Sequence, residues 1–207
     1  GRKHRNGAGT AAAPTLKPIG DLLISLLQDA NPEVRAQAAQ QLGDLRFRPA
    51  ASALLERLSA DTAARVRLFA GISLGRVGQQ QSVEPVLTML RQNAGSDRFL
   101  LHAGCMALLG MSDIPALKRL QRDASASVRQ AAVLALRRHA SPGISGFLND
   151  PDPSIAYLAA RAINDLPIEE ALPELATYLG KIDCPTNLLS RAINANFRVG
   201  DPRNATV

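Results

Sequence analysis

A short stretch that recurs along the chain decides the fold: NPEVRAQAAQQLG, at residues 31–43. Close copies are RVRLFAGISLG at 65–75 and SVRQAAVLAL at 127–136. Weaker copies begin at Phe99, Ile155 and Leu188. Aligned on a shared apolar residue, the copies have anchors at positions 34, 66, 99, 128, 155 and 188, which stand 27 to 33 residues apart. A period of this length predicts a protein built from stacked repeats.

Each copy has the spacing of an amphipathic helix, because apolar or small residues stand at the anchor and four and eight positions later, as in Val34, Ala38 and Leu42. A shorter apolar segment precedes each copy, as at residues 22–27. Each unit is therefore a pair of helices, and one pair cannot bury its own apolar face. We predict an all-α fold, a right-handed α–α superhelix (a solenoid) of about six helix pairs.

The composition excludes several classes of protein. Of 207 residues, 46% are hydrophobic and 20% are charged, which is enough to build a core. Aromatic residues make up only 3% and Trp is absent, which argues against β-sandwiches, barrels and propellers. The sequence has no run of 18 apolar residues, so it predicts no membrane-spanning helix. The chain begins at Gly1 without a signal peptide, and we expect it to be a piece of a longer protein.

Much of the net charge of +6 lies at the N-terminus. Four of the 24 basic residues precede the first acidic residue, Asp21; they are Arg2, Lys3, Arg5 and Lys17. The rest of the chain holds 20 basic and 18 acidic residues, so nucleic acid is an unlikely partner. We expect three regions: a flexible basic linker at 1–17, a repeat domain at 18–200 and the start of a following segment at 201–207.

An aspartate followed six positions later by an arginine recurs where the two helices of a pair meet. The pairs are Asp29 and Arg35, Asp61 and Arg67, and Asp123 and Arg129; Asp150 repeats the aspartate, with Ala156 in place of the arginine. With this motif the chain resembles HEAT repeats, especially the short bacterial type of phycobiliprotein-lyase-like proteins. The resemblance implies a structural ladder, in which the aspartate caps a helix and the arginine bridges layers. We expect Arg67 to stabilise the fold more than Arg57 on a solvated helix face.

A second resemblance concerns residues 161–199. They are similar to the HEAT segment of large secreted bacterial multidomain proteins, in which a dehydrogenase-like propeller precedes the repeats and a c-type haem domain follows. The chain has no Cys-x-x-Cys-His motif and no strand pattern of a propeller, so neither activity is assigned to it. The resemblance weakly favours an extracytoplasmic location, and the sequence otherwise leaves the compartment open.

The sequence predicts no catalytic, cofactor-binding or metal site. Cys105 and Cys184 fall about three repeats apart, too far for a disulfide. The three histidines, His4, His102 and His139, have no metal ligands spaced around them. Asp150 and Asp152 resemble a calcium loop, but no bidentate Glu or central Gly follows at the required offset, so we interpret them as a turn with helix caps.

A candidate partner surface comes from the positions that stacked second helices show to solvent, two, three, six and seven residues after the anchor. Repeats two and three are unexpectedly apolar there, and basic and aromatic residues follow further along. The candidate residues are Leu68, Phe69, Ile72, Leu101, His102, Met106, Tyr157, Arg161 and Arg191. Such a composition is typical of interfaces, although irregular packing that buries some of these side chains explains it equally well.

Three classes of function compete. The first is a non-enzymatic scaffold that binds another protein or a neighbouring domain of the same chain, because repeats supply an extended surface. The second is nucleic-acid binding, which needs a basic strip that these positions lack. The third is an accessory role in a secreted dehydrogenase or haem-binding protein, or in chromophore attachment, which rests on family analogy alone. We expect the scaffold and no cofactor.

Overall fold

Helices make up the computed structural model of the chain, which describes residues 13–78, 80–180 and 185–200. Within these ranges there are eleven α-helices, several short 3₁₀ helices and no strand. The α-helices are α1 Ala13–Leu26, α2 Pro32–Asp44, α3 Ala51–Ala60, α4 Ala64–Val77, α5 Val83–Asn93, α6 Arg98–Met111, α7 Ile114–Arg119, α8 Ala126–Arg138, α9 Pro153–Asp165, α10 Leu172–Ala176 and α11 Thr186–Val199. The longest 3₁₀ helix is η4, Pro142–Asn149.

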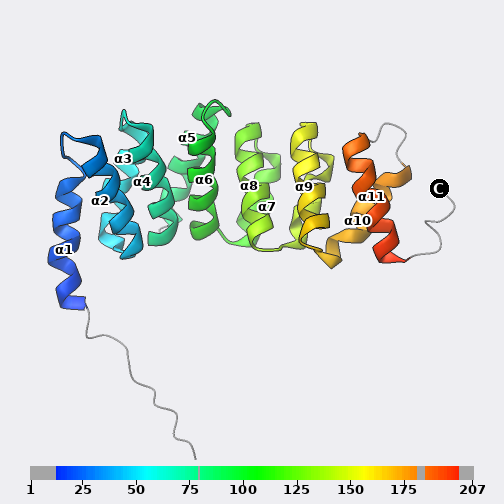
Figure 1. The fold of residues 1–207 in the computed structure, drawn as a ribbon, viewed down its shortest axis with the longest axis horizontal. Coiled ribbons are helices and arrows are strands. Elements are labelled where there is room, and N and C mark those ends of the chain that lie inside the picture. Colours follow the sequence, from blue (N-terminus) through cyan, green and yellow to red (C-terminus); the bar gives the residue numbers. More distant parts are fainter. Residues whose placement is uncertain (1–12, 79, 181–184, 201–207) are drawn as a thin grey trace, which may run out of the picture.

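The helices form six consecutive pairs, which we number as repeats one to six. The first helices of the pairs are α1, α3, α5, α7, η4 and α10, and the second helices are α2, α4, α6, α8, α9 and α11. Figure 1 shows the repeats side by side along the long axis of the molecule, from blue α1 to red α11. The predicted α–α solenoid of about six helix pairs is confirmed.

The second helices carry a continuous core. The anchors Val66, Val128 and Ile155 are buried, and so are the residues four and eight positions after each of them. This apolar stripe lets each second helix pack against its own first helix and against both neighbouring second helices. The stripe spacing read from the sequence is thus the spacing that builds the stack.

Repeat three is offset by one residue from the sequence alignment. Phe99, the expected anchor, is 52% exposed, whereas Leu100 is 4% exposed. Asp97 caps α6 by accepting hydrogen bonds from the backbone N–H groups of Phe99 and Leu100, and this cap fixes where the helix begins. The turn before the cap is lengthened by Ala94 and Gly95, whose φ values of 44° and 81° are left-handed.

The N-terminal helix extends into the region expected to be a linker. Helix α1 begins at Ala13, so residues 13–17 are helical. Residues 1–12, and the segment 201–207 that we expected to start a further unit, lie outside the described residues. None of the described helices has the length and hydropathy needed to cross a membrane.

Large apolar side chains are exposed at both ends of the stack. On α1, Ile19 and Leu22 are 51% and 60% exposed. On α11, Ile193 and Phe197 are 50% and 89% exposed. Each terminal helix thus buries one face against its neighbour and shows a second apolar face to solvent.

Candidate protein-binding surface

A buried arginine–aspartate pair joins repeat one to repeat two. Arg35 of α2 donates from Nε and Nη2 to the two carboxylate oxygens of Asp61, both at 2.8 Å. Its Nη1 donates to the carbonyl oxygens of Asp29 and Ala30 at 2.9 and 3.1 Å. Asp61 also accepts from the backbone N–H of Ala63 at 3.0 Å. One guanidinium therefore ties the turn of its own repeat to the turn of the next; we call this arrangement a rung.

The same rung joins repeat four to repeat five. Arg129 of α8 donates to both carboxylate oxygens of Asp150 at 2.8 and 3.0 Å. Its Nη1 donates to the carbonyl oxygens of Asp123 and Ala124, both at 3.0 Å. The side chains of Arg129 and Asp150 are only 8% and 0% exposed. The two rungs match atom for atom, so the motif has the same geometry wherever both halves are present.

The rungs shift the pKa values of their members. The hydrogen bond from Arg35 lowers the pKa of Asp61 below its ordinary value of 3.8, against the opposing effect of burial. The hydrogen bond to Asp150 raises the pKa of the Arg129 guanidinium above its ordinary value. Both shifts favour the charged forms, as expected for carboxylates and guanidinium groups that are paired when buried.

Arg67, the second arginine of the predicted ladder, does not bind a carboxylate in the described structure. Arg67 donates from Nε to the carbonyl oxygen of Leu58, in the first helix of its own repeat, at 3.0 Å. Arg57, expected on a solvated face, has a side chain only 15% exposed and lies 3.5 Å from Asp61. The contacts on which we based the predicted contributions of Arg67 and Arg57 to stability therefore differ from those in the structure.

Repeat three lacks both halves of the rung. At the turn position of Asp61 it has Asn93, whose side chain donates to the carbonyl oxygen of Asp97 and accepts from its N–H. In the register of the cap, Leu101 stands where the rung arginines stand, and it packs half-buried against the core. The turn carboxylate of repeat four, Asp123, is instead bound by Arg91 of α5 at 2.7 Å.

Close backbone contact takes the place of the rung between repeats two and three. A Cβ atom added at Gly75 of α4 would overlap the carbonyl oxygen of Met106 of α6, and one at Gly110 would overlap the backbone of Gly75. One turn earlier, a Cβ at Gly71 would press against Ala103. Helices α4 and α6 therefore approach each other so closely that only glycine fits at these positions.

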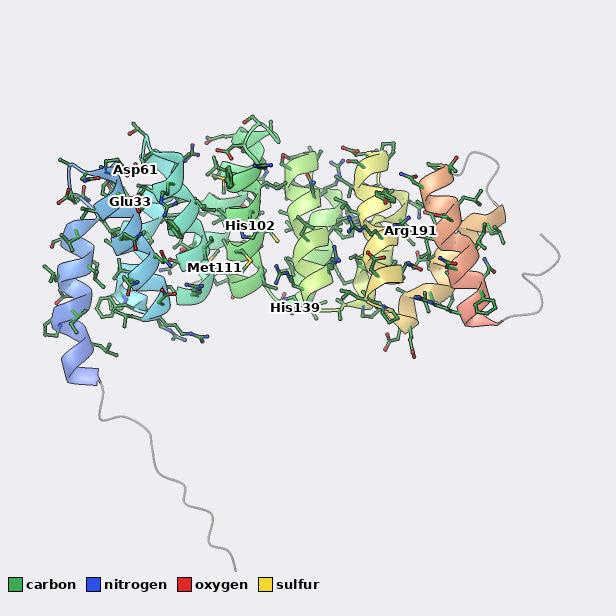
Figure 2. The ribbon with its side chains drawn as sticks, in the orientation of Figure 1. Glu33, Asp61, His102, Met111, His139 and Arg191 are labelled. Carbon is green, nitrogen blue, oxygen red and sulfur yellow. The ribbon has the colours of Figure 1, made fainter. Side chains whose placement is uncertain are left out.

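The exposed face of the second helices carries an apolar row in the middle of the molecule. Ile72 of α4, Met106 of α6 and Leu134 of α8 each stand six residues after a buried anchor, and all three are half-buried. Figure 2 shows His102 on this face of α6, one turn before Met106. These side chains lie on three consecutive second helices and are partly exposed, and Leu134 also packs against the core.

Two neighbouring hollows open along this row. One, of about 540 Å³, is lined by residues of α6 and α8 that include His102 and Leu134, and by Leu166 just after α9. The other, of about 470 Å³, is lined by Ile72, by Leu109 and by residues that follow α2. Met106 lines both, so the hollows adjoin each other. We call their combined lining the central groove.

Arginine is the charged residue of the central groove. Five arginines line it, and no Asp or Glu does: Arg46, Arg48, Arg76, Arg137 and Arg138. Arg76 forms an ion pair with Asp44 outside the lining. Within the part of the chain that the structure describes, Arg46, Arg137 and Arg138 form no ion pair with an acidic side chain.

The C-terminal part of the predicted surface is separate from the groove. The guanidinium of Arg191 lies 4.7 Å from the centre of the Tyr157 ring, and Figure 2 shows Arg191 between α9 and α11. Arg161 pairs with Asp165 at 3.1 Å on the same helix. These polar groups bind one another, and neither Tyr157, Arg161 nor Arg191 lines the groove.

The remaining residues of the predicted surface lie in three different places. Ile72, His102 and Met106 line the groove. Leu68 and Phe69 are half-buried on α4, and the guanidinium of Arg65 lies 5.0 Å from the Phe69 ring centre. Leu101 belongs to the joint between repeats three and four, as described above. Three of the nine predicted surface residues thus line the groove, three form the separate C-terminal cluster, and Leu68, Phe69 and Leu101 belong to neither.

Besides the arginines, the titratable side chains that line the groove are His102 and Cys105. Burial raises the pKa of the Cys105 thiol to about 11, so it is protonated at neutral pH. Among the described residues no three His, Cys, Asp or Glu side chains are grouped so that they could hold a metal ion. Asp150 and Asp152 serve the turn and the cap of α9, where Asp152 accepts from the N–H of Ser154. Cys184 and His4 lie outside the described residues.

The arginines of the groove were missed because the sequence analysis stopped seven residues after each anchor. Arg76 and Arg138 stand ten residues after Val66 and Val128, one helical turn further along the same face. Extending the count by one turn would have found these two. Arg46 and Arg48 follow the end of α2 and reach the groove only through the path of the chain after the helix, which no helical spacing encodes.

Comparisons with known proteins agree with this architecture. Residues 20–108 match the family model of HEAT repeats. The solved complex of CpcE and CpcF of phycocyanin lyase from Nostoc sp. PCC7120 is 22% identical, with a TM-score of 0.50 over 97% of this chain and 81% of that chain. The Escherichia coli protein YibA is 19% identical, with a TM-score of 0.46 over 98% of this chain and 80% of that one.

A computationally designed armadillo repeat protein for modular peptide recognition is also similar, at 16% identity and a TM-score of 0.40 over 84% of this chain and 97% of that chain. The curated proteins include no match to the sequence. At these identities the likeness to solved structures concerns the fold, while the family model matches the sequence itself. The sequence of residues 20–108 therefore matches HEAT repeats, and the repeats that follow continue the same arrangement of helix pairs.

Proposed function

We propose that the domain is a scaffold that binds another protein or a neighbouring domain of the same polypeptide, with no catalytic role of its own. HEAT and armadillo-like repeats are typically non-enzymatic scaffolds, which supports this proposal. The alternative role as an accessory module of a secreted dehydrogenase or haem-binding protein rests on the resemblance of residues 161–199, and it stays a prediction.

The apolar row of Ile72, Met106 and Leu134 carries the proposal. These three side chains occupy one register position on consecutive second helices, where each remains partly exposed, although Leu134 also packs against the core. Apolar side chains gathered on an exposed surface beside polar ones mark protein interaction sites. The adjoining hollows add the concave shape that a partner segment needs.

Site-specific photo-cross-linking tests the proposal. The cross-linking residue p-benzoylphenylalanine replaces His102 in the groove or, as the control, Thr88, which is exposed on the first helix α5. In cells that express the protein natively, we expect irradiation to give a discrete protein adduct from position 102 and none from position 88. Peptide mapping also detects a cross-link to a neighbouring domain of the same chain. Equal labelling at both positions, or neither kind of cross-link at position 102, would contradict the proposed function.

A further inference from the structure

We propose that the central groove binds an extended, acidic and apolar peptide segment of the partner. This inference rests on the proposed function and specifies the chemistry of what the scaffold binds. Its support comes from three properties of the groove: its length, its charge and the absence of aromatic side chains in its lining.

The groove is long and shallow, which suits a segment of chain. Its lining runs from the residues after α2, across α4, α6 and α8, to Leu166 after α9. With neighbouring helices about 9 Å apart, this path is on the order of 36 Å, which an extended chain covers with about 11 residues. A strand, loop or tail of a folded partner can present such a length.

The charge of the groove selects carboxylates. Five arginines and no acidic residue line it, and Arg46, Arg137 and Arg138 have no acidic partner among the described residues. A guanidinium offers a planar fork of donors that matches a carboxylate, as Arg35 and Arg129 show within this same chain. Glu and Asp side chains of a bound segment would supply the missing acceptors.

The apolar side chains between the arginines favour a peptide over nucleic acid. Ile72, Met106 and Leu134 form the middle of the groove, with Leu109 and Leu166 further along it. Single-stranded nucleic acids are bound by stacking of bases on aromatic rings, and no Phe, Tyr or Trp lines the groove. Aliphatic side chains alternating with carboxylates fit this surface, because they place apolar groups on the row and charges on the arginines.

Peptide selection on the intact chain tests the inference. A phage library of random peptides of about 12 residues, the length estimated above, is selected on the immobilised protein. We expect the recovered peptides to be enriched in Asp and Glu together with Leu, Ile, Val or Phe. Synthetic peptides from the selection are then titrated by fluorescence anisotropy, beside an oligodeoxythymidine of similar length.

Two charge-reversal variants localise the binding. Arg46→Glu with Arg138→Glu changes two exposed arginines of the groove, and we expect peptide affinity to fall at least about tenfold. The matched control, Arg119→Glu with Arg122→Glu, makes the same change of net charge on exposed arginines of α7 and the turn after it, and should leave the affinity within about twofold. Circular dichroism of each variant checks that it is folded, and Arg46→Gln with Arg138→Gln gives a milder second test.

The outcomes separate this inference from the proposed function. Recovery of basic or purely apolar peptides, equal loss in both variants, or tighter binding of the oligonucleotide through the same arginines would each overturn the acidic-peptide inference. If that happens while position 102 still cross-links to a protein, the scaffold function stands. If position 102 gives neither a protein adduct nor a cross-link to another domain of the same chain, the scaffold function itself is wrong.

Discussion

Repeats one and two are joined by a buried ion pair, whereas repeats two and three are joined by direct contact between backbones. In the first joint, Arg35 and Asp61 form two hydrogen bonds of 2.8 Å. In the second, Gly75 and Gly110 allow α4 and α6 to touch. Gly43 of α2 also packs closely against Ser73 of α4 in the first joint, so the comparison teaches that close contact at glycine is common to both joints and that the paired charges are added only in the first.

The largest effect is expected from breaking a rung. Asp150→Ala leaves Arg129 buried without its carboxylate, and we expect the free energy of unfolding to fall by about 3 kcal/mol, because an uncompensated buried charge is costly. Urea unfolding followed by circular dichroism measures the change. Asp165→Ala, which removes the more exposed pair with Arg161, is the control and should cost under about 1 kcal/mol. Equal losses would mean that the rung contributes no more than a surface pair.

The glycine joint should respond to added volume. Gly75→Ala puts a methyl group against the backbone of Met106, and we expect a loss of about 2 kcal/mol, although alanine is the better helix former. Gly143→Ala is the matched control, because its new Cβ would meet only the flexible side chain of Lys118. Thermal melts measure the stability of both variants. A Gly75→Ala protein as stable as the parent would show that α4 and α6 can separate without loss of stability.

Arg35 and Arg67 occupy equivalent positions in repeats one and two, but we expect them to contribute differently to the free energy of unfolding. Arg35→Ala should cost about 1 kcal/mol more than Arg67→Ala, because Arg35 serves a carboxylate that is 1% exposed, whereas Arg67 donates from Nε to one carbonyl oxygen. Chemical denaturation of the two single variants gives the difference. A greater loss of stability for Arg67→Ala would contradict this expectation and would support the continuous ladder that the sequence motif implies.

The smallest expected effect is a loss of stability at acid pH. It should depend on the charged joint between repeats one and two and not on the glycine joint between repeats two and three. The pKa of Asp61 is lower in the folded chain than its ordinary 3.8, so the unfolded chain binds a proton at higher pH than the folded one. Stability from this group is therefore complete above about pH 5 and is lost as the pH falls through 3.8 towards the folded pKa. We expect Asp61→Asn to flatten this acid loss partly, and Gly75→Ala to leave it unchanged. Unfolding midpoints measured between pH 3 and 6 test both expectations.

The repeat and its helix pairs could be predicted from the sequence because the period of the apolar residues is the period of the stack. The anchor of repeat three could not, because Ala94 and Gly95 lengthen its turn and shift the register that a fixed spacing assumes. For the same reason Leu101 was assigned to the exposed surface, although it occupies the position of a rung arginine.

The candidate site was predictable only in part. Ile72, His102 and Met106 follow from helical spacing, and they line the groove. The groove as a whole also depends on Arg46 and Leu166, which belong to chain segments after α2 and α9. Residues brought together by different inter-helix segments have no common spacing in the sequence, so only the three-dimensional arrangement shows that they share one surface.

The rung residues on either side of repeat three are complementary in charge. Arg67, at the end of the preceding joint, has a donor group not committed to a carboxylate, and Asp123, in the following turn, is bound by Arg91 of the repeat in between. If repeat three were excised, the arginine of one neighbour would face the aspartate of the other, in the order found at the intact rungs. Repeat three thus stands between the two halves of one rung; its Arg91 takes the aspartate, and the arginine is left to bind a backbone carbonyl.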